Sequence, residues 1–180
     1  MNSDQRFRDL GDEDRKWLSD QRRTIEKLLA GNPDAQLKYQ TSAGKLGTIR
    51  AVLEGCTFRS DQTFELQGLG IILGDALSAE MGLVWKMLED QYGISPCLVA
   101  EGTSVVLYPQ TMISKRIERG EAVDVFDLFN SVCDQIEDLK ARGAEMTPNS
   151  SFQRTCRSNG GCIAWCTTSR SSGATDTQIR

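Results

Sequence analysis

Residues 62–89 read QTFELQGLGIILGDALSAEMGLVWKMLE, and they decide the fold. Up to Met81 the apolar residues recur every three or four positions, behind the Ser60-Asp61 cap signal, which predicts a helix. Its apolar stripe is broad, as in a helix buried against several neighbours. From Leu83 onward, apolar residues alternate along the chain, which predicts a strand over 83–89.

Two more short apolar runs follow this strand. They cover Cys97–Ala100 and Ser104–Tyr108, with Glu101-Gly102-Thr103 between them. A three-residue loop that contains glycine is common in hairpins. The sequence therefore predicts a three-stranded antiparallel meander over the middle of the chain.

Helical patterns flank the meander on both sides. Before residue 62, the spacing of apolar residues predicts helices over 12–30 and from about 37 to Gly55. After the meander, Thr111 caps a short helix that runs to Arg119, and Asp124 caps a final, longer helix. The expected fold class is α+β, with N-terminal helices, a three-stranded antiparallel meander, two C-terminal helices and an irregular tail.

The periodicity stops after Pro148. Ser, Thr, Gly and Asn supply 17 of the 34 residues over 147–180, a composition typical of a tail or linker. We therefore expect a single α+β domain over 1–146, with its helical N-terminal part at 12–54, and a flexible tail over 147–180.

Composition excludes several classes of function. The chain has no histidine, which removes Ser-His-Asp hydrolases, Cys-His proteases and histidine-ligated zinc or haem. The longest apolar stretch, Leu69–Leu77, contains Asp75 and is too short to cross a bilayer. The polar N-terminus has no following apolar core, so we expect no secretory signal and a cytoplasmic location.

The charge is distributed unevenly. Residues 1–146 carry 17 basic and 24 acidic side chains, while residues 147–180 carry four arginines against Asp176 alone. Because phosphate binding needs a basic face, the acidic body argues against a nucleic-acid partner.

Charged residues near the middle of the chain are candidates for partner or ligand binding. Asp75 lies among apolar residues and needs a cation or a backbone donor unless it faces solvent. The natural cations are those of the 115–119 segment, if the late helices pack on the central one. The simplest interpretation of Asp75 is a structural ion pair or a solvated helix edge.

Two further charge groups complete the candidate set. Glu89 and Asp90 could act as an acid–base pair or hold a hard metal, but neighbours on a strand point to opposite faces. Lys115, Arg116 and Arg119 form the densest cationic cluster, which is either a solvated helix face or a partner-binding surface.

The tail holds the chain's metal candidates. Cys156, Cys162 and Cys166 cluster there, but they lack the CxxC spacing of zinc knuckles and have no fourth ligand. We therefore expect neither a metal site nor a cofactor.

Several segments together resemble a family of small bacterial domains of unknown function. They are 64–70 (FELQGLG), 74–77 (GDAL), Trp85, 89–93 (EDQYG), 102–104 (GTS), Pro109, 111–121 (TMISKRIERGE) and 123–125 (VDV). The resemblance covers roughly residues 55–140, with a family-like core over 55–142, and the 111–121 run is its most specific part. It implies a soluble bacterial domain and supplies no catalytic residue.

Two classes of function remain open. The first is a non-catalytic protein-interaction module, such as an adaptor or a toxin-neutralising immunity-type protein, favoured by the acidic body and the missing acid–base pair. The alternative is a small-molecule-binding domain or an enzyme that uses a carboxylate, lysine and arginine pocket. A protein partner is expected, and the oligomeric state is left open.

Overall fold

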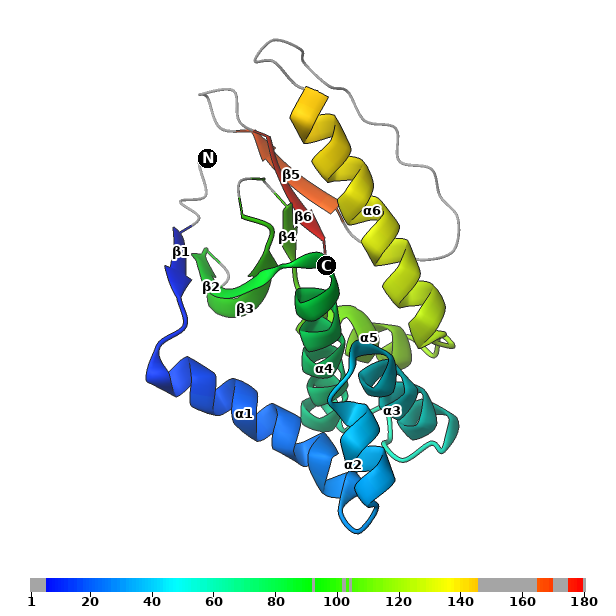
Figure 1. The fold of residues 1–180 in the computed structure, drawn as a ribbon. Coiled ribbons are helices and arrows are strands. Elements are labelled where there is room, and N and C mark those ends of the chain that lie inside the picture. Colours follow the sequence, from blue (N-terminus) through cyan, green and yellow to red (C-terminus); the bar gives the residue numbers. More distant parts are fainter. Residues whose placement is uncertain are drawn as a thin grey trace.

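The computed structural model describes residues 6–91, 93–101, 103, 105–145, 165–169 and 175–179. It confirms the α+β class (Figure 1). The helices are α1 (Asp12–Glu26), the short 3-10 helix η1 (Lys27–Leu29), α2 (Pro33–Tyr39), α3 (Ser42–Glu54), α4 (Thr63–Met81), α5 (Pro109–Glu118) and α6 (Val125–Glu145). The strands are β1 (Arg6–Asp9), β2 (Val84–Asp90), β3 (Gly93–Val99), β4 (Val105–Leu107), β5 (Trp165–Ser169) and β6 (Thr175–Ile179).

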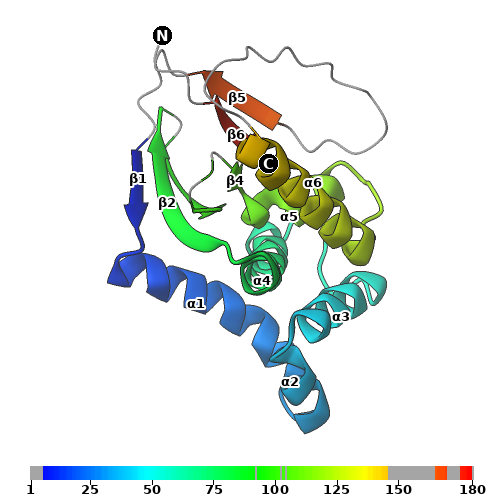
Figure 2. The same cartoon turned by 45° about the horizontal axis from the view of Figure 1, so that its top comes forward.

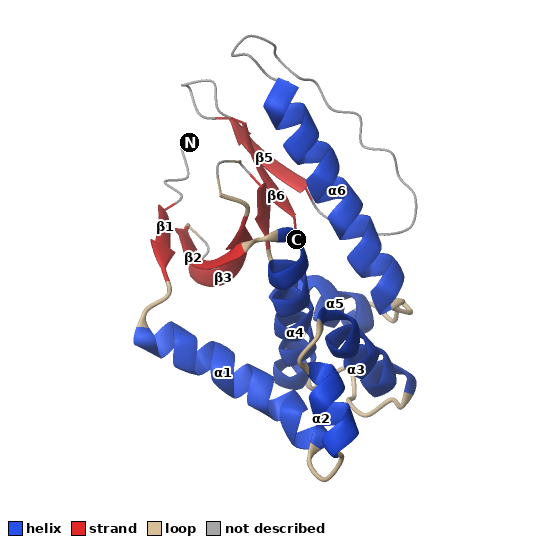
Figure 3. Cartoon of the chain, viewed as in Figure 1, coloured by secondary structure: helices blue, strands red, loops and turns tan. Residues whose placement is uncertain are grey.

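The six strands form one sheet in the order β1-β2-β3-β4-β6-β5. Strands β2, β3 and β4 pair antiparallel in sequence order, so the predicted meander is confirmed. Strand β1 adds to β2 antiparallel, whereas β6 pairs with β4 in the parallel direction. Figure 3 shows these strands gathered in one layer, with the helices outside it.

The prediction of an irregular tail is wrong for two segments, because 165–169 and 175–179 form β5 and β6. The high content of Ser, Thr, Gly and Asn over 147–180 predicted no regular structure, and so these two strands were missed. Strand β5 reads WCTTS, and aromatic and β-branched residues favour strands. Strand β1 was also missed, since four residues reading RFRD give too little alternation to detect. Whether the tail is flexible is not tested by these strands and stays a prediction.

The expected helix boundaries need three corrections. The Ser60-Asp61 cap is not found, because Gln62 is the N-cap of α4 and its side chain makes no cap hydrogen bond. The region from 37 to 55 is divided between α2 and α3, because the Thr41 hydroxyl accepts a hydrogen bond from the Gly44 amide at 3.0 Å and starts a new helix. Helix α5 begins at Pro109 rather than after Thr111, since proline fits the first turn of a helix. The predicted cap is confirmed, because Asp124 Oδ1 accepts from the Phe126 and Asp127 amides at 2.9 and 3.1 Å.

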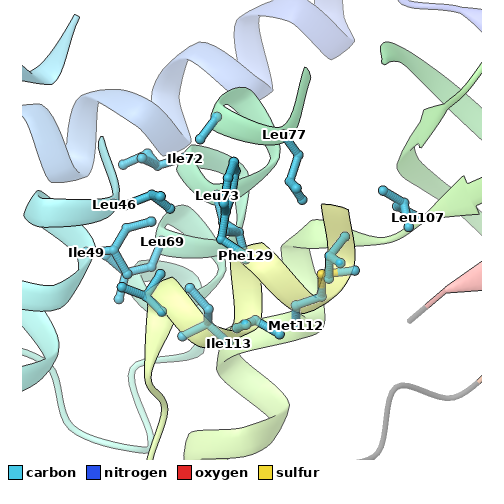
Figure 4. Packing of buried hydrophobic residues seen from close by; sticks show 14 of the residues in the cluster. Leu46, Ile49, Leu69, Ile72, Leu73, Leu77, Leu107, Met112, Ile113 and Phe129 are labelled. Carbon is cyan, nitrogen blue, oxygen red and sulfur yellow. The ribbon is translucent and has the colours of Figure 1, made fainter. Parts of the chain in front are cut away.

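Helix α4 lies at the centre of the molecule. It contacts α1, α3, α5 and α6, which surround it in Figure 2. Its Leu69, Ile72 and Leu73 are fully buried, and Figure 4 shows them among side chains from α3, α5 and α6. The broad apolar stripe of the sequence therefore marks the central helix, as predicted.

Glycines on α4 allow its neighbours to approach closely. A Cβ added at Gly70 would lie 2.4 Å from the Pro109 carbonyl oxygen, and one at Gly74 would lie 2.5 Å from the Trp85 ring. Glycines three or four positions apart in a helical pattern predict close approach of another backbone, and the structure confirms this here. It places the start of α5 and the β2 indole directly against the central helix.

Candidate functional site

Asp75 on α4 is the centre of a polar cluster that joins α1, α4 and β2. Arg22 of α1 donates to both carboxylate oxygens, from Nε to Oδ2 at 2.6 Å and from Nη2 to Oδ1 at 2.7 Å. The Trp85 indole Nε1 donates to Oδ1 at 3.1 Å. Both oxygens of Asp75 are therefore already engaged in contacts that hold the fold.

The surroundings of this pair are partly shielded from water. The side chains of Arg22 and Asp75 are 27% and 16% exposed. The hydrogen bond to Asp75 raises the pKa of Arg22, and burial, with the charges of Glu26 and Asp75, raises the pKa of the Tyr39 phenol. Both shifts favour the forms that Arg22 and Tyr39 already have near neutral pH, a charged guanidinium and a neutral phenol, as expected for a structural cluster rather than an acid–base site.

The predicted partners of Asp75 were wrong. The cations of the 115–119 segment lie toward the end of α5, whereas α5 meets the Asp75 end of α4 through its first residue, Pro109. With a rise of about 1.5 Å per residue, six residues place Lys115 roughly 9 Å further along the helix. Arg22, Tyr39 and Glu26 were all missed, because no local pattern links residues more than thirty positions from Asp75.

The alternation of apolar residues from Leu83 puts Trp85 on the same strand face as Leu83 and Met87, which predicts a largely buried indole between sheet and helices. It does lie on the sheet face toward α4, but it is half-buried rather than largely buried. The ring packs on Gly74 while its Nε1 reaches the partly exposed Asp75 carboxylate. The polar edge of the indole explains the remaining exposure.

The three cations of the 115–119 segment have different environments. Lys115 is exposed. Arg116 is buried, with 9% exposure, and its Nη1 donates to the Met112 carbonyl. Arg119 pairs with Glu121 through two hydrogen bonds, of 2.7 and 3.2 Å. Arg116 therefore does not contribute to an exposed cationic surface.

We expect Arg116→Ala to lower the free energy of unfolding by about 2 kcal/mol, since it removes a buried hydrogen bond and the packing of a long side chain. Lys115→Ala should change it by less than about 0.5 kcal/mol, because the side chain is exposed. Urea denaturation of both variants measures the difference. Equal losses would contradict these assignments.

Glu89 and Asp90 do not form a site together. Strand β2 continues in regular register through both, with Glu89 opposite Ile94 and Asp90 opposite Gly93. Without a bend, consecutive side chains point to opposite faces of the sheet. The geometric objection raised by the sequence is therefore confirmed.

The structure also contains a cavity that the sequence did not indicate. It has a volume of about 330 Å³ and lies where the end of α3, the start of α4, the end of α5 and the segment before α6 meet. Its lining residues are Val52, Leu53, Glu54, Cys56, Phe58, Leu66, Leu69, Ile117, Glu121, Ala122 and Val123. None of the six candidate residues lines this cavity. Phe58, an isolated aromatic residue in a polar loop, is the one signal that could have suggested it.

The described residues contain neither a cluster suited to a metal ion nor a helix that could span a membrane. Within them, no three His, Cys, Asp or Glu side chains are placed to hold a metal ion. The Cys156, Cys162 and Cys166 side chains lie outside the described residues. No helix in the described part of the chain is long and apolar enough to span a membrane.

The thiols that the structure describes should differ strongly in reactivity. Burial raises the pKa of Cys97 to about 12, and burial with nearby carboxylates raises the pKa of Cys133 to about 11. At pH 8 fewer than about one in a hundred of these thiols is ionised. Cys56 at the cavity rim is exposed.

In a variant with serine at positions 156, 162 and 166, we expect one rapid reaction with a disulfide reagent, at Cys56. The other two thiols should react only after unfolding. Mass spectrometry of the labelled peptides identifies the site, and rapid labelling of Cys97 in the folded protein would contradict its buried position.

Comparison with known proteins gives a match to a family model and a similar fold. The model of DUF3806, a domain of unknown function, matches residues 45–129, from α3 to the first turns of α6. The matched segment starts and ends earlier than the residues 55–140 predicted from the resemblance. No curated protein is similar enough to count as a match.

A crystal structure from Bacteroides thetaiotaomicron has a similar fold. Its TM-score is 0.59 at 16% sequence identity, over 73% of this chain and 48% of that one. This chain thus corresponds to about half the length of that protein, and the similarity shows the fold alone. The family that the sequence resembles is DUF3806, a domain of unknown function, and it is matched by residues 45–129.

Proposed function

We propose that the protein is a non-catalytic protein-interaction module of a bacterial cytoplasm, such as an adaptor or a toxin-neutralising immunity-type protein. One observation carries this proposal: the six charged candidate residues lie on α4, on β2 and at α5 with its C-cap, and none of them lines the cavity. Asp75 holds α1 and β2 against α4, Glu89 and Asp90 face opposite ways, and the cations of α5 have separate environments. An enzyme would need several such groups to converge on one pocket.

The outer face of α6 supports an interaction with a basic partner. Asp127, Asp134, Glu137 and Asp138 are exposed, and their spacing places them along one side of the helix. Together with the acidic balance of residues 1–146, they would attract a basic protein surface and accelerate its association.

The alternative, a small-molecule-binding domain or enzyme, is favoured by one observation, the cavity of about 330 Å³. This volume lies at the lower end of the roughly 300–1,000 Å³ typical of ligand sites. Its lining lacks the cationic half of the carboxylate, lysine and arginine set that this alternative requires.

The proposal is tested by identifying a partner and locating its contact. The immobilised full chain captures proteins from the native host, and a captured protein is purified and titrated against the parent chain. A variant with Asp127→Lys, Asp134→Lys and Glu137→Lys should bind at least about tenfold more weakly. A control with Glu13→Lys, Asp34→Lys and Glu101→Lys, all exposed positions on other parts of the chain, should bind nearly as the parent.

A partner that binds both variants equally would exclude the face of α6 as its contact. The absence of any saturable protein partner, together with turnover or saturable binding of a small molecule, would favour the alternative function.

A further inference from the structure

Strand β4 closes the meander and has the character of an interior strand. Its three residues, Val105, Val106 and Leu107, are all apolar and all buried. Val105 and Leu107 belong to the main core, whereas Val106 belongs to a second apolar cluster with Leu88 and Cys97. Both faces of β4 are therefore covered, and a continuous apolar run of this kind is typical of a strand inside a sheet rather than at its edge.

The opposite edge of the sheet is protected by charge. The sheet ends there at the exposed strand β1, in which Arg6, Arg8 and Asp9 are charged. Charged side chains on an edge strand discourage the addition of another strand. Strand β4 carries neither a charge nor a proline. Without a neighbour, its unpaired backbone groups would form an apolar edge that a further strand can join.

Strand β6 supplies that neighbour from the end of the chain. It pairs with β4 in the parallel direction, with Gln178 opposite Val106, and β5 pairs with its outer side (Figure 1). Within the described part of the chain, β4 is the element with which this C-terminal hairpin, β5 with β6, makes its main contact. Because the hairpin belongs to the same chain, it reaches β4 at an effective concentration of roughly millimolar, which favours it over a separate molecule.

From these observations we infer that the edge of β4 is a strand-addition site, filled by β6 within the chain and open to a second copy of the chain when the C-terminal hairpin leaves. A second copy fits this edge because two β4 strands present the same short apolar run, and they can pair about a twofold axis with no charge of their own between them. This inference goes beyond the proposed function and does not depend on it, since the acidic face of α6 takes no part.

The test uses the full chain with Thr177→Pro and Gln178→Pro, under reducing conditions. Successive amides of a strand point to opposite sides, so one of the two prolines removes an amide that faces β4. In dilute solution, the amides of Val105–Leu107 should exchange with solvent at least about tenfold faster than in the parent chain, as followed by NMR. At higher concentration the variant should reach twice its single-chain mass in light scattering, while the parent keeps one mass.

Two controls locate the association at the β4 edge. The matched variant with Thr177→Val and Gln178→Val keeps both amides and should behave as the parent in exchange and in mass. A synthetic peptide of residues 165–180, with Cys166→Ser, should return the proline variant to the mass of one chain with one peptide. The same peptide carrying the two prolines should not.

Each part of the inference can be overturned. Unchanged exchange at β4 in the proline variant would mean that β6 does not cover this edge, and unfolding of the variant would mean that the hairpin belongs to the core. Faster exchange without any increase in mass would exclude a second copy as the occupant. Association that the unmodified strand sequence in the peptide does not reverse would place the contact elsewhere.

Discussion

Asp75→Ala is expected to lower the free energy of unfolding by about 3 kcal/mol, which corresponds to a fall of roughly 6–12 °C in melting temperature. The substitution leaves the Arg22 guanidinium and the Trp85 indole N–H without their shared acceptor. Breaking a buried pair costs about 3–5 kcal/mol, and the partial exposure of these side chains places the effect at the lower end. Thermal and urea unfolding, followed by circular dichroism, measure it.

A matched control is provided by Asp61. It accepts two hydrogen bonds from Arg59 at 2.9 and 3.0 Å, in the same bidentate manner, but these side chains are 68% and 78% exposed. Asp61→Ala should therefore melt with the parent, because exposed pairs contribute little. If Asp75→Ala had the same melting temperature as the parent, Asp75 would not stabilise the fold. It would then be a candidate for ligand or partner binding again.

The fold was predictable wherever a local pattern determines the local structure. The stripe on 62–81, the alternation from Leu83 and the cap at Asp124 each depend on a few neighbouring residues, and each is found in the structure. Strands β5 and β6 were missed because a sheet edge supplies half of a strand's hydrogen bonds. Composition does not show which edge is available.

The candidate residues were predictable in type but not in arrangement. The sequence identified Asp75 as a carboxylate that needs a donor, yet Arg22 lies 53 positions away and only the crossing of α1 over α4 brings it close. The cavity was not predictable at all. It exists because side chains from four segments leave a space, and apolar periodicity cannot distinguish a wall of a cavity from a filled core.

Gly70→Ala is expected to lower the free energy of unfolding by about 3 kcal/mol, at the upper end of the range for overpacking. The new Cβ would lie 2.4 and 2.6 Å from the carbonyl oxygens of Pro109 and Gln110. These are backbone atoms, so no rotamer change relieves the contact and the start of α5 must move away from α4. Urea denaturation measures the loss.

Gly47→Ala is the control with the opposite sign. A Cβ at Gly47 in α3 meets no atom within 4 Å, so the substitution should gain about 0.5–1 kcal/mol from helix propensity alone. A Gly70→Ala protein as stable as the parent would mean that α5 lies further from α4 than the structure shows. The cavity that α5 helps to line would then be wrong as well.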